Sequence, residues 1–437
     1  MAHALTSLVV GVAVGGALAG AANPTEMASR VAAAVQARTP TVDVSATDTQ
    51  AQISARARTL HEDALIFDAH VHVVNRQFYH GGDMGHRVND GQFDLARAKE
   101  GGIDAMFFSL FVTEQYYPAR FETKQVLRLI DAAYDQLARN TDKIELALTA
   151  SDVERISKTG RIAAFMDLEG GFDLDGDLGV LRNLYRLGLR SFQLSAHNWA
   201  NNFADSCCAP GKWHGLNDRG RAVVREANRL GMVINVSHGS DETIAQAIDL
   251  SADPIVATHH GLRSVNNIPR NLPDDLLKKL AAKGGVIGFQ IGNEFHNVKV
   301  FNWRTEHAGK PFWDTTDIGR KEAGMTIEEI DKAAAPQFPM VGVNAPDDIR
   351  FTPYDWLAVV DRAIELVGED HVMLGSDFDG GPTLPLGMRD IRDLPTLTDA
   401  MLKRGWSEQR IRKFLGGNLL RVVGQVTERP RRNTDKQ

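Results

Sequence analysis

The side chains best suited to chemistry in this sequence are histidines and carboxylates that follow short apolar runs. The first are His70 and His72, in the segment Asp68-Ala69-His70-Val71-His72 at the end of the apolar run 64–67. Residues two apart in a β-strand point to the same face, so both imidazoles can approach one point. Two imidazoles that converge in this way can share a metal ion. By itself such a pair is more often incidental than functional.

Later apolar runs end in the same kinds of residue, which gives the first pair its significance. These residues are Glu169, His197, His238, His259 and Asp377. Four imidazoles and one carboxylate can hold two divalent ions, with Glu169 as the bridge. Two ions about 3.5–4 Å apart can share a hydroxide and polarise a carbonyl group. Imidazole-rich ligation favours zinc, with other divalent transition metals as the alternative.

Each of these residues also has an ordinary structural interpretation. Either His259 or its neighbour His260 could be a core histidine, and we favour His259 as the ligand. Glu169 precedes Gly170 and Gly171 and could belong to a turn, as could Asp377. For any one residue the ordinary interpretation is the more convincing. It becomes unconvincing for all of them together, because they follow successive apolar runs in one ordered series.

The elements that would position these residues are strands alternating with helices from about residue 60. We predict eight strands, at 65–73, 104–112, 162–168, 190–195, 232–237, 254–258, 285–291 and 371–376. Such alternation predicts an α/β fold, a (β/α)₈ TIM barrel, in which the carboxyl ends of the strands build the active site. An open doubly wound sheet is the alternative, which the absence of a GxGxxG loop after a strand makes less favourable.

The helical patterns lie mostly between these strands. We predict helices at 124–139, 178–187, 218–230, 326–334, 354–366, 397–404 and 408–423. One more helix begins at Asp241, which we predict as its N-cap. Another follows Pro273, because proline suits the first turn of a helix. Residues 293–350 interrupt the alternation and are predicted to be a long insertion after strand seven with one short helix.

Composition excludes several classes of protein. The chain has 437 residues, of which 43% are hydrophobic, enough for a large core. The net charge of -7 gives no electrostatic footprint for nucleic acid. The 2 cysteines, Cys207 and Cys208, are adjacent and cannot connect distant segments. We predict two loop thiols, with a disulfide between them as the alternative.

The ends of the chain suggest a division into four parts. Residues 1–22 form a candidate signal peptide, since 5–20 are apolar and small residues follow in a cleavage-like pattern. Residues 23–58 are predicted to be a flexible leader, 59–426 a metal-dependent hydrolase barrel, and 427–437 a polar tail. We expect an exported protein, periplasmic or secreted, with a cytoplasmic one as the alternative. The run 5–20 is too short for a stable membrane span.

At this point the sequence resembles the membrane dipeptidase (renal dipeptidase) family of zinc peptidases, within the amidohydrolase superfamily. The resemblance covers roughly residues 60–425. The matching segments are Asp68-Ala-His70, Met166-Asp-Leu-Glu169-Gly-Gly, residues 178–188, Val236-Ser-His238, Thr258-His259, Arg270-Asn-Leu-Pro-Asp274 and Gly375-Ser-Asp377-Phe-Asp-Gly380. The resemblance implies a binuclear zinc barrel that hydrolyses dipeptides, often with a D-residue at the C-terminal position.

The resemblance also implies roles for individual residues. His70, His72 and Glu169 would hold one zinc ion, and Glu169, His238 and His259 the other. A metal-bridging hydroxide would attack the peptide carbonyl. The remaining roles would be proton shuttle for Asp377, contact with the substrate carbonyl for His197, and a clamp on the substrate carboxylate for Arg270. A planar bidentate donor suits that last task.

Two positions depart from the family pattern. The family usually has His-x-Asp in the first strand, whereas this chain has His70 and His72, which leaves the site one unit more positive. Gln290 stands where a family tyrosine would approach the substrate. The superfamily's other bridging group, a carbamylated lysine, is not expected because residues 190–195 contain no lysine.

We therefore predict a hydrolase, a metallo-dipeptidase with two Zn²⁺ and a small peptide as its substrate. The alternative is another amidohydrolase reaction at the same site, on N-acyl amino acids, lactones or phosphoesters. A barrel that binds metal or peptide without catalysis is less favoured, since a binder needs no proton shuttle. We expect no nucleic-acid partner and allow for a homodimer.

Overall fold

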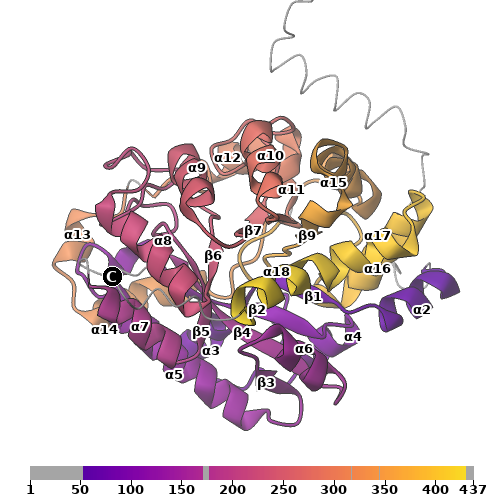
Figure 1. Ribbon diagram of the computed structural model, residues 1–437, viewed down its shortest axis with the longest axis horizontal. Helices are drawn as coiled ribbons and strands as arrows, with labels where there is room; N and C mark the ends of the chain where they lie inside the picture. The colour runs from indigo at the N-terminus through magenta and orange to yellow at the C-terminus, as the bar shows by residue number, and fades with distance from the viewer. Residues whose placement is uncertain (1–52, 171–176, 316, 344, 430–437) are drawn as a thin grey trace, which may run out of the picture.

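A computed structural model describes residues 53–170, 177–315, 317–343 and 345–429 (Figure 1). The candidate signal peptide at 1–22 lies outside the described residues, as do most of the predicted leader at 23–58 and most of the polar tail at 427–437. These assignments stay predictions. The first described helix, α2 (Ala55–Asp63), begins where the Ser54 side chain accepts a hydrogen bond from the Ala57 N–H.

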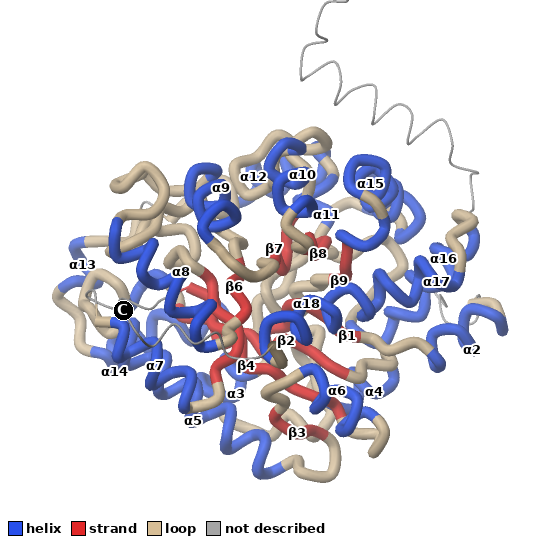
Figure 2. Tube along the Cα trace, in the orientation of Figure 1, coloured by secondary structure: helices blue, strands red, loops and turns tan. Residues whose placement is uncertain are grey.

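Eight parallel strands form the centre of the molecule, as predicted (Figure 2). In their order along the sheet they are β1 (Phe67–His72), β2 (Ala105–Val112), β4 (Ile162–Gly170), β5 (Leu189–Gln193), β6 (Val233–Asn235), β7 (Val256–His260), β8 (Val286–Phe289) and β9 (Val372–Leu374). The segment after β9 returns to β1, where the His72 N–H donates to the Phe378 carbonyl (2.9 Å). The sheet is thus nearly closed, and the TIM barrel is confirmed. A short strand missing from the prediction, β3 (Ile144–Leu146), pairs only with β4.

Helices cover the outside of this barrel (Figure 1). Besides α2 they are α3 (Val74–His80), α4 (Leu95–Glu100), α5 (Glu122–Arg139), α6 (Ala150–Ser157), α7 (Leu178–Arg186), α8 (Asp218–Leu230), α9 (Asp241–Leu250), α10 (Asp274–Ala282), α15 (Pro353–Val367), α16 (Leu394–Lys403), α17 (Glu408–Arg412) and α18 (Asn418–Thr427). In α4, α6, α7, α8, α9, α15 and α17 the N-cap side chain accepts a hydrogen bond from an N–H group of the first turn. The predicted N-cap of α9 is wrong by one residue, because the Ser240 side chain accepts from the Thr243 N–H.

The last predicted helix, 408–423, is divided in the structure. A π-helical turn, η7 (Lys413–Gly417), separates α17 from α18. The cause is close packing against the start of β1, where a Cβ on Gly416 would lie 2.5 Å from the Leu65 carbonyl oxygen. Only glycine allows this approach, and the wider turn accommodates it.

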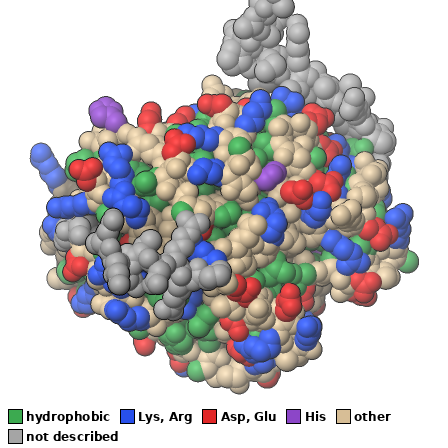
Figure 3. All heavy atoms as spheres, viewed as in Figure 1, with side chains coloured by type: hydrophobic (Ala, Val, Ile, Leu, Met, Phe, Trp, Pro, Cys, Tyr) green, Lys and Arg blue, Asp and Glu red, His purple; other side chains and the backbone are tan. Residues whose placement is uncertain are grey.

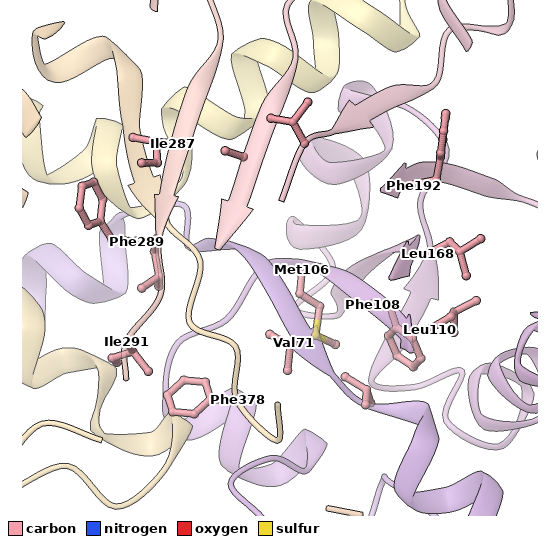
Figure 4. Close-up of a cluster of buried hydrophobic side chains, with 14 of the residues drawn as sticks. Val71, Met106, Phe108, Leu110, Leu168, Phe192, Ile287, Phe289, Ile291 and Phe378 are labelled. Atoms are coloured by element: carbon pink, nitrogen blue, oxygen red, sulfur yellow. The ribbon is translucent and has the colours of Figure 1, made fainter. Parts of the chain in front are cut away.

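Two apolar layers hold the strands. One lies between strands and helices and includes Val71, Phe108, Leu168, Phe289 and Phe378 (Figure 4). The other lies inside the barrel toward the amino ends of the strands. It contains Phe67, Ala69, Ala105, Phe107, Ala163, Phe165, Val233, Val256, Val286 and Met373, with Val422 and Val426 of α18 beside them. We call this second cluster the lower plug. It leaves the carboxyl half of the barrel interior to polar residues.

A bulge in β1 aims the first histidine pair. Phe67 and Ala69 belong to the lower plug, so continued alternation would send Val71 inward and His70 outward. The register with β2 shifts between Asp68 and Val71, and Val71 packs in the outer layer instead. One extra residue in a strand re-aims the side chains that follow it. His70 and His72 therefore both reach the barrel interior.

The insertion holds more structure than the single predicted helix. Its helices are α11 (Asn293–His296), α12 (Val298–Ala308), α13 (Arg320–Ala323) and α14 (Ile327–Ala334), followed by the 3₁₀ turn η3 (Ala335–Gln337). Asp331 attaches α14 to the barrel by accepting hydrogen bonds from the Tyr116 hydroxyl (2.6 Å) and the Arg128 guanidinium (2.5 Å). This attachment holds the segment after α14 over the carboxyl end of the barrel.

The prediction of two loop thiols is wrong. Cys207 and Cys208 form a disulfide, the alternative considered above. The Cys207 N–H donates to the His238 carbonyl (2.8 Å), and the Cys208 N–H donates to the Ser206 hydroxyl (3.5 Å). In this turn the adjacent sulfur atoms meet. The turn therefore lies against the chain just beyond β6.

The surface agrees with the sequence in two respects. Basic and acidic side chains are interspersed over the face shown in Figure 3, as expected for a chain with a net charge of only -7. Among the described residues, no helix has both the length and the apolar composition needed to cross a bilayer.

Candidate metal centre

Glu169, at the end of β4, is the centre of the polar half of the barrel. Its Oε2 atom lies 2.8 Å from Nε2 of His72 and 3.0 Å from Nε2 of His70. Its Oε1 atom lies 3.0 Å from Nε2 of His238 and 3.4 Å from Nε2 of His259. The two oxygens of one carboxylate thus face two separate pairs of imidazoles. All five side chains are buried.

These residues come from strands spread around the barrel. The pair from β1 meets Glu169 of β4, His238 after β6, His259 of β7 and Asp377 after β9. His238 (φ 66°) and Asp377 (φ 64°), together with His197 (φ 52°), have left-handed backbone conformations. Non-glycine residues adopt this conformation at a cost and concentrate at functional sites. At each of these positions the chain turns sharply as it leaves its strand.

Neighbouring side chains orient three of the four imidazoles through Nδ1. The Ser109 hydroxyl lies 2.8 Å from Nδ1 of His70. Asn198 Oδ1 lies 3.0 Å from Nδ1 of His238, and the Thr258 hydroxyl lies 3.0 Å from Nδ1 of His259. Such partners leave Nε2 free to ligate a metal.

Asp377 stands beside the first imidazole pair. Its Oδ1 atom lies 3.2 Å from Nε2 of His72, and its Oδ2 atom accepts a hydrogen bond from the Gln290 amide (3.1 Å). Burial would raise the pKa of Asp377, but the hydrogen bond with His72 and the charges of the nearby imidazoles lower it to about 2. Gly380 gives this carboxylate room, since a Cβ there would lie 1.9 Å from Asp377 Oδ1.

Arg270 borders the second imidazole pair. Its Nη2 atom lies 2.9 Å from Nε2 of His238 and donates to the His259 carbonyl (3.2 Å). The guanidinium lies over the Phe295 ring, 5.4 Å from its centroid. Nη1 is buried without a hydrogen-bond partner among the described residues, and burial lowers the pKa of Arg270 to about 10. A buried guanidinium with a free donor is suited to an anionic ligand.

His197 lies next to the centre rather than within it. Its Nδ1 atom is hydrogen-bonded to the Glu114 carboxylate, and its Nε2 atom is 3.8 Å from Glu169 Oε1. The ring packs against His238 with centroids 4.0 Å apart. Of the imidazoles around Glu169, His197 is the most exposed, at 18% of its side chain. It can therefore contact a bound molecule.

The two imidazole pairs differ in their electrostatics. Burial would lower the pKa of His70, but the charge of Glu169 and the hydrogen bond with Asp167 raise it to about 10. Burial and the charge of His70 lower the pKa of His259 to about 3. For Glu169, burial is outweighed by the charges of His70 and His72, which hold its pKa well below the usual range.

A cavity of about 470 Å³ opens over these groups. Its floor holds Glu169, His72, His197, His238, His259, Arg270 and Asp377. Its walls come largely from the insertion and the segment after β9, and they include Phe312, Pro336, Pro339, Met340 and Val341. Arg304 of α12 also lines it and pairs with the buried Glu294 carboxylate. The volume is typical of a small-molecule site.

The structure brings together all the predicted site residues: His70, His72, Glu169, His197, His238, His259, Arg270 and Asp377. His260 points elsewhere, with neither ring nitrogen hydrogen-bonded among the described residues. Sequence reasoning gave no role to Ser109, Glu114 or Asp167, which lie behind the histidines. A polar residue inside an apolar strand, such as Ser109 in β2, was the available signal.

The donor set fits divalent metal ions. The possible ligands form three groups, and within each group the ligand atoms lie within 4.8 Å of one another. The groups are His70, His72 and Asp377; His70, Glu169 and His259; and Glu169, His197 and His238. Imidazole nitrogens and carboxylate oxygens are the ligands of catalytic zinc. In this structure hydrogen-bonding neighbours already orient the buried rings of His70, His238 and His259.

Comparison with known proteins identifies the family. Residues 54–437 match the family model for membrane dipeptidase, peptidase family M19. The chain belongs to this family. It is therefore a metallopeptidase of a dipeptidase family, and the resemblance seen in the sequence is confirmed.

Individual relatives agree. The dipeptidase verJ of Clonostachys rogersoniana is 32% identical over 345 residues, which cover 77% of this chain and 76% of the relative. Dipeptidase 3 of Rattus norvegicus is 28% identical, over 78% of this chain and 60% of the relative.

Two solved structures share the fold. The probable dipeptidase PvdM of Pseudomonas aeruginosa has a TM-score of 0.71 and 23% identity, covering 87% of this chain and 100% of its own. A metallo peptidase of Rhodobacter sphaeroides, liganded with a phosphinate mimic of the dipeptide L-Ala-D-Ala, has a TM-score of 0.63 and 24% identity, covering 83% of this chain and 100% of its own.

Proposed function

We propose that this protein is a binuclear zinc dipeptidase that accepts a D-residue at the C-terminal position of its substrate. The observation that carries the proposal is the division of Glu169, whose Oε2 faces His70 and His72 while Oε1 faces His238 and His259. A carboxylate between two imidazole pairs is suited to bridging two ions. The related Rhodobacter peptidase, which binds an L-Ala-D-Ala mimic, supports the substrate class.

The proposed ligands are His70, His72 and Glu169 for one ion and Glu169, His238 and His259 for the other. When bound, such ions polarise the scissile carbonyl and lower the pKa of the attacking water. Asp377 stands beside the first pair in its ionised form, with Gln290 holding its outer oxygen. It can accept the proton of the attacking water and pass it to the leaving amine.

Arg270 and His197 would position the substrate. The free Nη1 donor of Arg270 is suited to the C-terminal carboxylate of a dipeptide. Glu114 orients His197 so that its Nε2 points toward Glu169. From there the imidazole can contact the carbonyl oxygen of a bound substrate. The wall formed by Phe312, Pro339 and Met340 makes this side of the cavity apolar.

The first experiment measures metal content and turnover on the same sample. We expect two zinc ions per chain and hydrolysis of both an L,L and an L,D dipeptide. N-acyl amino acids, lactones and phosphoesters serve as the comparison panel. Turnover of a panel member with none of either dipeptide would refute the proposal, as would a fully active protein with one ion.

The second experiment tests the shuttle with Asp377→Asn. General acid–base catalysis contributes about 10²–10⁴-fold, so kcat should fall by at least 10²-fold while the metal content stays unchanged. If dipeptide turnover stays within about tenfold of the wild type with metal bound, Asp377 is not the shuttle.

The third experiment tests the carboxylate clamp with Arg270→Ala. A dipeptide with a free C-terminus should lose about 10²-fold in kcat/KM, which corresponds to the loss of a charge-assisted hydrogen bond of up to about 3 kcal/mol. The same dipeptide with a C-terminal amide should lose far less. Equal losses on the two substrates would exclude the clamp.

A further inference from the structure

The four imidazoles around Glu169 differ in what supports them from behind. His238 and His259 are supported by neutral groups, the Asn198 amide and the Thr258 hydroxyl. Nδ1 of His72 has no hydrogen-bond partner among the described residues. His70 alone has a carboxyl group behind it: Asp167 Oδ2 lies 3.5 Å from its Nδ1.

Strand register places this carboxyl group. Ser109 of β2 pairs with Asp167 of β4 on one side and with His72 of β1 on the other. The Ser109 hydroxyl lies 2.8 Å from His70 Nδ1 and 3.3 Å from Asp167 Oδ2, so it bridges the two. Three neighbouring strands thus bring Asp167 and Ser109 level with His72, and their side chains reach the ring of His70, two residues earlier in β1.

Burial makes this arrangement costly unless positive charge lies near it. Asp167 is fully buried, and its Oδ1 atom has no hydrogen-bond partner among the described residues. Removing a carboxylate from water costs several kcal/mol unless a cation compensates. Within the described chain no lysine or arginine forms an ion pair with Asp167, and its ion-pair partner is His70.

The opposite half of the centre has the reverse charge environment. Arg270 Nη2 lies 2.9 Å from Nε2 of His238, so a guanidinium borders that pair. On the first half, Asp377 Oδ1 adds a second carboxylate, 3.2 Å from Nε2 of His72. Cations are attracted to the first half and repelled by the guanidinium beside the second.

We propose that Asp167 is a positioning residue that acts through Ser109 and His70 to make the His70–His72 half the tighter of two unequal metal positions. This inference rests on the binuclear site proposed above. A carboxylate behind a ligating imidazole fixes the ring and raises its basicity, and loss of such a partner typically weakens metal binding 10–100-fold. The His238–His259 half would be filled second.

The test is stepwise zinc binding by the metal-free full chain, measured by competition with a chromophoric chelator. The wild type should bind two ions in two separate steps. In Asp167→Asn the tighter step should weaken 10–100-fold, while the weaker step changes by less than about threefold. Ser109→Ala, which removes only the bridge, should weaken the same step by a smaller factor.

Asn198→Ala is the matched control, since it removes the corresponding partner of His238. It should weaken the second step and leave the first unchanged. Cobalt added at one equivalent gives a spectroscopic readout, because its absorption spectrum should change in Asp167→Asn and not in Asn198→Ala. Thermal melts of the metal-free variants check folding, and Ser109→Ala carries the test if Asp167→Asn does not fold.

The outcomes separate this inference from the proposed function. If the wild type binds two ions and Asp167→Asn weakens both steps equally, or neither, the inference is wrong and the binuclear site stands. If the wild type binds a single ion, the binuclear site and the inference both fail.

Discussion

The two halves of the barrel interior are built from the same strands but differ in chemistry. Toward the amino ends, Phe67, Phe107 and Phe165 pack in the lower plug, with α18 beside them. Toward the carboxyl ends, β1 and β4 place His70 and Glu169 in a buried polar centre. Burial of apolar rings stabilises the fold, whereas burial of unpaired polar groups costs stability. Stability and chemistry are therefore separated along the axis of the barrel, and the comparison can be tested at both ends.

The largest expected effect is on the upper half. Glu169→Gln removes the charge that both imidazole pairs face, so metal content and dipeptide turnover should fall to background. The melt should remain a single cooperative transition, because the lower plug is unchanged. Elemental analysis, turnover and circular dichroism measure these three quantities. Glu328→Gln, at an exposed position, is the control. The prediction is contradicted if Glu169→Gln binds two ions and its turnover stays within tenfold of the wild type.

In the lower half, Phe165→Ala should have the opposite effect, so that stability falls and turnover is retained. Phe165 is fully buried and stacks on Phe67, with ring centroids 5.6 Å apart. Its removal should lower the free energy of unfolding by about 3–5 kcal/mol, measured by urea denaturation. Turnover per folded molecule should change by less than about twofold.

Leu127→Ala is the control for the cavity that Phe165→Ala leaves, because Leu127 is 46% exposed. This substitution should lower the free energy of unfolding by less than about 0.5 kcal/mol. A kcat for Phe165→Ala more than tenfold below the wild type, in protein shown to be folded, would mean that the two halves are not separate.

The stability of the fold should depend on pH through His61 of α2. Its ring is hydrogen-bonded to the Thr398 hydroxyl (2.7 Å) and the Gly101 carbonyl (2.9 Å), and burial lowers its pKa from 6.5 to about 4. The unfolded chain takes up this proton first, so the contribution is complete above pH 6.5 and is lost as pH falls to about 4. The difference of about 2.5 in pKa corresponds to about 3 kcal/mol.

Urea denaturation from pH 7 to pH 4 checks this prediction. The free energy of unfolding should fall by about 3 kcal/mol less in His61→Gln than in the wild type over that range. His307→Gln, at an exposed position, should follow the wild type. Parallel curves for the wild type and His61→Gln would show that His61 does not contribute.

The smallest effect should come from the rim of the upper half. Asp331→Asn weakens the contacts that attach α14 to Tyr116 and Arg128. Because this site is partly exposed, the contacts should contribute only about 1 kcal/mol to stability. Because the segment after α14 lines the cavity, KM should rise up to about fivefold with little change in kcat. Steady-state kinetics measure both. Asp317→Asn, in an exposed pair with Lys310, should leave KM unchanged; equal shifts in the two variants would refute a specific role for Asp331.

Much of the fold and of the candidate site could be predicted from the sequence. The eight barrel strands and most helices follow from local periodicity, and the site residues from their place at strand ends. Two of the errors arose where distant contacts decide the local structure. Gly416 packs against Leu65 and interrupts a helix whose periodicity predicts continuity. β3 exists because it pairs with β4, and its three residues carry little signal alone.

By itself the sequence determined the alternation of strands and helices and the residue types at their ends, because both are local patterns along the chain. Only the tertiary structure decided how those ends are used. The bulge that turns His70 inward, the division of Glu169 between two imidazole pairs, and the row of Asp167 and Ser109 behind His70 all depend on register between strands. Register is set by side chains that meet across the sheet, some of them 99 residues apart in the chain, as His70 and Glu169 are.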